Sequence, residues 1–162
     1  MTYLPDGCAK PDQAALEAFW QAAQDTLPEA GLPNDYQVRW IGLDAESTWQ
    51  IFALIRAGDK TGTFTLPWIV DRTQQPTPRV GDAIILIDFD GTPTMLIRLT
   101  DIEDVPFGEI TNEHTAVDGP PVRDVAIWRP LHTQYWNAML APFDLSVSDD
   151  MPVWIEKFEV LL

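Results

Sequence analysis

The residues best suited to chemistry in this sequence lie together in one short stretch, Gly58 to Thr65. The stretch contains Lys60 and a set of threonines that includes Thr61 and Thr63. The apolar segment before it predicts a helix that ends at Gly58, and the alternating residues after it predict a strand. Side chains at such a junction lie at the rim of a sheet, where functional groups concentrate. We therefore take Lys60 and Thr63 as the centre of a candidate site.

Lys60 could act as a base or as a fixed positive charge. A lysine that accepts a proton must first be neutral, and the negative charge of the whole chain favours the ammonium instead. A charged lysine that contacts an anionic or polar substrate, or stabilises an oxyanion, has no such requirement. The structural alternative is a solvated lysine that interacts with the C-terminal end of a helix dipole. We favour the charged contact over the base.

The threonines at 61, 63 and 65 alternate with Gly62 and Phe64, so their hydroxyls share one face of the predicted strand. A plain polar strand edge would have the same pattern. The two histidines, His114 and His132, and the single cysteine are too few for the usual metal-binding motifs. We expect no metal and no cofactor, and we expect His132 to pack beside Trp128, four residues earlier on a predicted helix.

Composition limits the classes of partner. The chain has 162 residues, enough for one ordinary domain with its own core. Its formal net charge is −15. That charge opposes tight binding of long DNA or RNA, because such binding depends on Lys and Arg that release counterions from phosphates. A small nucleoside-like molecule, or a few nucleotides in a locally positive pocket, is compatible with it.

The sequence also bears on location. The first eight residues lack the basic start and apolar run of a signal peptide. The longest clear apolar run, residues 83–87, is too short to cross a bilayer. We therefore expect a cytoplasmic protein without membrane partners.

Periodicity predicts an α+β fold with a mostly antiparallel, barrel-like sheet flanked by helices. Asp12 and Asp124 are typical helix caps, and Asp90-Gly91 is typical of a hairpin turn. The expected helices cover residues 12–27, 45–57, 104–115 and 124–139. The expected strands cover residues 36–42, 61–65, 83–89, 94–100 and 154–162. We see no linker, and expect a single domain over residues 1–162, with the first helix packed on it.

Several motifs in this order resemble the ASCH domain family, in its longer bacterial branch. The resemblance covers roughly residues 40–162 and depends on the ordered set, since no motif is specific alone. The motifs are Gly58-Asp-Lys60-Thr61-Gly-Thr63, Pro78-Arg-Val-Gly81-Asp82, Phe107-Gly-Glu-Ile110, Glu113-His114, Asp118-Gly119, Trp128-Arg129 with His132, and Glu156-Lys-Phe158-Glu-Val160.

This resemblance implies a PUA-like barrel with a cleft beside the lysine, and a link to RNA. Some family members are similar to amidohydrolases that deacylate an acetylated cytidine, and others look like ribonucleases. The amidohydrolases use a lysine, a threonine three residues later and a glutamate, which correspond here to Lys60, Thr63 and Asp118. The aspartate is one methylene shorter than the glutamate, a difference that matters for catalytic geometry. Asp118 could also be only a turn residue before Gly119.

Other positions are candidates for substrate binding. Thr61 shares the strand face of Thr63, and Trp68 could stack on a base. Arg129 could contact an anion or form a salt bridge, and Asp124 stands where this branch carries a serine.

The leading hypothesis is a hydrolase that acts on RNA or on a modified nucleoside in a pocket around Lys60. The alternatives are a non-catalytic module that binds RNA or a nucleotide in the same cleft, and a regulator that acts through protein contacts.

Overall fold

The computed structural model describes Leu4 and residues 6–162. Residues 1–3 and 5, which belong to the stretch considered above for a leader, lie outside the described residues. The described helices are α1 (Gln13–Thr26), α2 (Ala45–Arg56), α3 (Pro67–Arg72), α4 (Asn112–Thr115) and α5 (Val125–Leu140), with 3-10 turns at Pro28–Ala30, Phe107–Glu109 and Ala141–Phe143. The strands are β1 (Gln37–Trp40), β2 (Gly62–Thr65), β3 (Ala83–Ile87), β4 (Pro93–Pro106) and β5 (Pro152–Val160).

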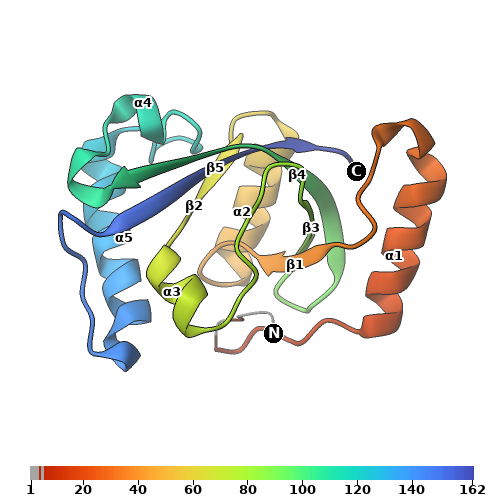
Figure 1. The fold of residues 1–162 in the computed structure, drawn as a ribbon, viewed down its shortest axis with the longest axis horizontal. Coiled ribbons are helices and arrows are strands. Elements are labelled where there is room, and N and C mark those ends of the chain that lie inside the picture. The colour runs from red at the N-terminus through yellow and green to blue at the C-terminus, as the bar shows by residue number, and fades with distance from the viewer. Residues whose placement is uncertain (1–3, 5) are drawn as a thin grey trace.

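In this part of the chain the strands form one five-stranded sheet with the order β1-β3-β4-β5-β2. The pair β1–β3 is parallel and the other pairs are antiparallel, as in the predicted α+β class. Among the described residues no pairing joins the edge strands β1 and β2, so the curled sheet is an open half-barrel. The barrel-like sheet that we expected is therefore present in part, as a curled sheet that does not close fully. Figure 1 shows α1 and α5 at opposite ends of the molecule, with the long strands β4 and β5 crossing between them.

The expected helix at residues 104–115 is wrong over its first part. Strand β4 continues to Pro106, because β5 provides a partner for it from Ile97 onward. Val105 lies opposite Val153, and Pro106 lies opposite Pro152. Helical structure is limited to the turn at Phe107–Glu109 and to α4. Long-range pairing has overridden the local cap and proline signals on which the prediction depended.

Strand β3 is buried on both faces, which explains its continuous apolar run. Ile84 and Leu86 pack in the cluster that contains Phe52 of α2. Ile85 and Ile87 pack on the other face, in the cluster that contains Trp20 of α1. The helix α1 is therefore attached to the outer face of the sheet and α2 covers the inner face.

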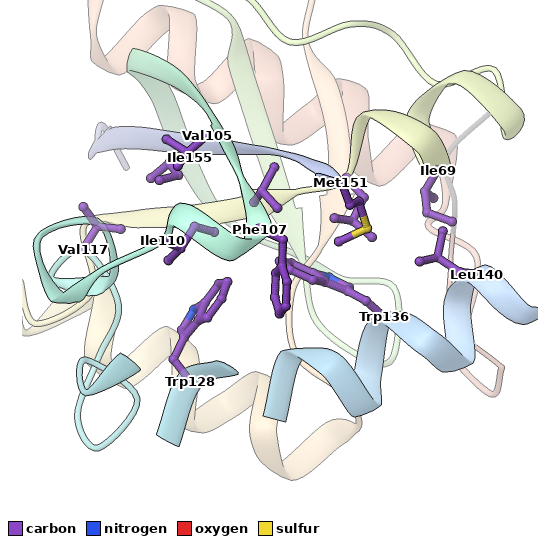
Figure 2. Packing of buried hydrophobic residues seen from close by; sticks show 12 residues of the cluster. Ile69, Val105, Phe107, Ile110, Val117, Trp128, Trp136, Leu140, Met151 and Ile155 are labelled. Atoms are coloured by element: carbon purple, nitrogen blue, oxygen red, sulfur yellow. The ribbon is translucent and has the colours of Figure 1, made fainter. Parts of the chain in front are cut away.

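Helix α5 closes one end of the molecule with aromatic side chains. Trp128 and Trp136 are fully buried and lie against Phe107, as Figure 2 shows. The predicted cap is confirmed, because the Asp124 side chain accepts a hydrogen bond from the Ala126 backbone N–H. Trp49, whose place on a face of α2 predicts a core residue, is instead half exposed.

Candidate functional site

A cavity of about 630 Å³ is enclosed by residues of β1, α2, β2, α3 and α5. Its wall includes Lys60, Thr63 and Asp118, together with Arg39 and His132. The remaining wall is largely apolar and aromatic, with contributions from Phe64, Leu66, Tyr135 and Trp136. A volume of this size, apolar with a few polar groups, is typical of a small-molecule site.

Lys60 and Asp118 form a buried ion pair in this wall. The Lys60 Nζ donates to Asp118 Oδ1 at 2.6 Å, and both residues are less than a tenth exposed. At this distance each charge stabilises the other, because the surrounding protein screens the attraction less than water does. The pair therefore places a cationic donor and its counter-charge side by side in the cavity wall.

The end of α2 directs Lys60 into the cavity. The chain leaves the helix through Gly58, whose φ of 76° is easily adopted only by glycine. The backbone N–H groups of Asp59 and Lys60 both donate to the carbonyl of Leu54, which fixes the turn. The predicted helix end at Gly58 is thus confirmed, and the turn places Lys60 inside rather than in solvent.

Arg123, which sequence reasoning did not select, joins the loops that carry the two ionised groups. Its Nε donates to the Asp118 carbonyl at 2.8 Å, and its Nη2 donates to the carbonyl of Asp59, next to Lys60. A second link is the carbonyl of Val117, which accepts from the backbone N–H groups of Thr61 and Gly62. Together these contacts hold the loop of Asp118 against the start of β2.

A second ion pair, between Arg39 and Glu156, was also missed. Arg39 Nη1 donates to Glu156 Oε2 at 2.5 Å, and Glu156 is completely buried. The other carboxylate oxygen, Oε1, is buried without a hydrogen-bond partner in the described part of the chain. The alternation of apolar and charged residues over 154–160 predicts a strand, and charged side chains ordinarily face solvent. The curl of the sheet instead turns this face of β5 inward, where Phe158 packs against Ile84.

His132 packs as predicted and also lines the cavity. Its ring stacks on Trp128 with centroids 4.1 Å apart, and its Nδ1 lies 2.9 Å from the Trp128 carbonyl oxygen. Burial lowers the pKa of His132 to about 4, and the positive charge of Lys60 acts in the same direction. The hydrogen bond to Trp128 and the charge of Asp118 oppose the lowering of this pKa. The ring is therefore neutral at physiological pH, with its proton on Nδ1 and the lone pair on Nε2.

The proposed substrate-binding residues lie away from the cavity. Thr61 is exposed before β2, and Trp68 packs on the hydrophobic cluster of α5. Arg129 donates to the carbonyls of Phe107 and Ile110, at 2.7 Å each, and its guanidinium stacks on the Phe107 ring. Asp124 serves as the cap of α5. None of these four residues lines the cavity.

Leu4 and residues 6–162 contain no cluster of metal-ligating side chains and no helix able to span a membrane. Within that part of the chain, no three His, Cys, Asp or Glu side chains come together as a metal site would require. None of the described helices has the length and apolar character needed to cross a bilayer.

The geometry can be compared with known proteins. No curated protein sequence matches the chain. The chain is similar to the crystal structure of protein EF3133 from Enterococcus faecalis V583, with 26% identity and a TM-score of 0.79 over 92% of this chain and 89% of that one. It is also similar to the crystal structure of an ASCH domain from Lactobacillus crispatus JV V101, with 16% identity and a TM-score of 0.82 over 92% and 95% of the two chains. At 16% identity, the similarity to the Lactobacillus crispatus domain shows a shared fold only.

The sequence model of the ASCH domain matches residues 39–162. This range begins at Arg39 in β1 and contains every side chain named above in the cavity wall. Residues 1–38, which include α1, precede the match. The chain therefore belongs to the ASCH domain family.

Proposed function

We propose that this protein is a hydrolase that removes an acyl group from a modified nucleoside bound in the cavity around Lys60. The observation that carries the proposal is the buried ammonium of Lys60, which lines the same cavity as the hydroxyl of Thr63. The resemblance to acylcytidine amidohydrolases assigns these positions the same spacing, a lysine followed by a threonine three residues later. Asp118 stands in place of the glutamate.

The ion pair supports one of the two roles considered for Lys60. A lysine that donates to a carboxylate at 2.6 Å is a poor proton acceptor, whereas its charge can stabilise the oxyanion that forms when an amide carbonyl is attacked. Thr63 is then the nucleophile, and Asp118 orients the ammonium and balances its charge. A preorganised charge of this kind requires no proton transfer from the lysine before the reaction.

The cavity favours a nucleoside over long RNA as substrate. Its volume of about 630 Å³ falls within the usual range for small-molecule sites, about 300–1,000 Å³. The positive groups in its wall, Lys60 and Arg39, are both paired with carboxylates, so they offer little unpaired charge to a phosphate backbone. Phe64, Tyr135 and Trp136 provide aromatic surface for a base.

The test is a turnover assay on N-acylated cytidines and, separately, on short labelled RNAs. The wild-type protein should release cytidine and the free acid, detected by chromatography and mass spectrometry. Thr63→Val keeps the side-chain shape but removes the hydroxyl, and should lower turnover by at least about 10²-fold. Thr61→Val is the matched control, because that threonine is exposed outside the cavity and its loss should leave turnover unchanged.

The outcomes separate the hypotheses. RNA cleavage without deacylation would replace the amidohydrolase by a ribonuclease. Saturable binding of a nucleoside, without product from any substrate, would instead support the non-catalytic binding module. Equal turnover by wild type and Thr63→Val would remove Thr63 from the mechanism.

A further inference from the structure

Thr63 and Glu156 face each other directly across the β2–β5 pair. In an antiparallel pair, directly opposed residues point to the same face and have Cβ atoms about 4.5–5.5 Å apart. Glu156 Oε1 is fully buried and has no partner, and no hydrogen bond reaches the Thr63 hydroxyl within the described residues. A free acceptor and a free donor therefore occupy neighbouring positions on the inner face of the sheet.

A chain of hydrogen bonds fixes the other end of Glu156. Its Oε2 accepts from Arg39 Nη1, and Arg39 Nη2 donates to Gln37 Oε1 at 3.1 Å. Gln37 Nε2 in turn donates to Asp82 Oδ2 at 2.7 Å. Because these contacts occupy only one carboxylate oxygen, Oε1 is left free to accept a hydrogen bond. A buried acceptor without a donor is costly to the folded state, and such exceptions require an explanation.

Glu156 is not itself among the residues that line the cavity, and the polar groups that do line it are less suited to accept a proton from Thr63. Lys60 acts as a hydrogen-bond donor in the pair with Asp118. The Oδ1 of Asp118 accepts from both Lys60 Nζ and the Gly119 N–H. His132 lines the same cavity, but its ring is held between Trp128 and Phe64, and within the described residues no hydrogen bond joins it to Thr63.

We propose that Glu156 is the general base that activates Thr63, with Arg39 as the residue that positions it. This inference rests on the proposed function in taking Thr63 as the nucleophile. The charge of Glu156 is balanced by Arg39, and the β2–β5 register places its unpartnered Oε1 on the residue directly opposite Thr63. Nucleophile, base and orienting group then form the arrangement expected of an activated hydroxyl.

The proposed reaction has two stages, acylation of Thr63 and hydrolysis of the resulting ester. The Thr63 Oγ1 bonds to the acyl carbon of the amide while its proton moves to Glu156 Oε1. The C–N bond then breaks, and the leaving amine takes that proton. Water attacks the resulting ester of Thr63 and gives a proton to Glu156. The bond between Thr63 Oγ1 and the acyl carbon breaks, the carboxylic acid leaves, and Thr63 recovers the proton from Glu156.

The experiment uses p-nitrophenyl acetate, an activated ester that acylates a reactive hydroxyl without the natural substrate. Acetylation of Thr63 is followed by rapid quench and peptide mass spectrometry, with Thr63→Val as the background. Glu156→Gln should slow acylation by at least about 10²-fold, the usual contribution of a general base. The same variant should also abolish the solvent deuterium isotope effect on acylation. If Glu156 had a purely structural role, this isotope effect would remain.

The matched control is Glu159→Gln, which breaks another Arg–Glu pair on β5, that between Glu159 and Arg98 outside the cavity. This control should acylate at the wild-type rate. Each variant is first compared with the wild type by circular dichroism. Should Glu156→Gln not fold, Glu156→Asp keeps the charge beside Arg39 but withdraws the carboxylate from Thr63, and should also slow acylation.

Wild-type acylation rates in Glu156→Gln or Glu156→Asp, with the isotope effect retained, would overturn the inference and leave the proposed function intact. No acylation of wild-type Thr63 would also overturn it, while the assay on acylated cytidines decides the proposed function separately. Slow acylation in the Glu156 variants supports the inference even if the natural substrate is not a cytidine.

Discussion

Lys60 and Asp118 are 58 positions apart in the sequence, yet their charged atoms lie 2.6 Å apart inside the protein. The contact joins the end of α2 to the loop between α4 and α5. Burying two charges is costly in itself, and the pair is stabilising only while both partners are present. The same pair therefore connects the stability of the fold to the chemistry of the cavity.

Removing one member of this pair should destabilise the protein strongly. Asp118→Ala leaves the Lys60 ammonium buried without a counter-charge, and should lower the free energy of unfolding by about 3–5 kcal/mol. Urea denaturation measures this value. The double variant Lys60→Met/Asp118→Leu should recover most of the loss, because apolar residues can replace a buried pair. In the control Asp101→Asn, which breaks the exposed pair with Lys157, the loss should stay below about 1 kcal/mol. An Asp118→Ala variant as stable as this control would contradict the prediction.

Gly62 should be required for docking of the Asp118 loop. A Cβ at this position would lie 2.8 Å from Val117 Cγ2 and 2.9 Å from the Glu156 carbonyl oxygen. Gly62→Ala should therefore cost about 1–3 kcal/mol in the free energy of unfolding, as overpacked sites do. Adding Val117→Ala should restore part of this loss, because it removes Cγ2 but leaves the contacts with Val117 Cβ and the Glu156 carbonyl oxygen. Full stability of Gly62→Ala would show that the loop moves away without cost.

Arg129 should contribute to stability rather than to ligand binding. Arg129→Lys loses the planar fork that bonds the Phe107 and Ile110 carbonyls, and should lower the free energy of unfolding by about 1–3 kcal/mol. The Kd of a nucleoside ligand, measured by calorimetry well below the unfolding temperature, should not change. A weaker Kd in Arg129→Lys would restore Arg129 as a substrate-binding residue.

The part of the site that could be predicted from sequence is the part encoded locally. Gly58 ends a helix and β-branched residues follow it, so Lys60 and Thr63 could be placed at a junction without knowledge of the tertiary structure. Asp118 was reached only through the family resemblance, since its own neighbourhood is also typical of a turn. Its contact with Lys60 depends on Arg123 and Gly62, which have no distinctive local pattern.

Arg39 and Glu156 show why the remainder could not be predicted. An alternating strand does not say which face points inward, and charged residues are normally assigned to solvent. Here the curl of the sheet encloses the face that carries Glu156, and the register of β2 on β5 places it opposite Thr63. Register depends on pairing between segments about ninety residues apart, which a single sequence does not reveal. The expected helix at residues 104–115 failed for the same reason.

The protonation of His132 should make stability depend on pH. Its pKa is about 4 in the folded protein, below the ordinary value of 6.5, so the unfolded chain binds the proton first as pH falls. The stabilising effect of the neutral ring is complete above pH 6.5 and is lost progressively toward pH 4, a change of about 3 kcal/mol. The relevant measurement is the difference in unfolding free energy between wild type and His132→Phe, followed by urea denaturation across this range. Phenylalanine keeps the stacking on Trp128 but cannot titrate. The carboxylates common to both proteins contribute equally, so their effects cancel in the difference. The wild type should therefore lose more stability than His132→Phe as pH falls. A difference that stays constant with pH would mean that His132 takes up its proton as readily in the folded protein as in the unfolded chain.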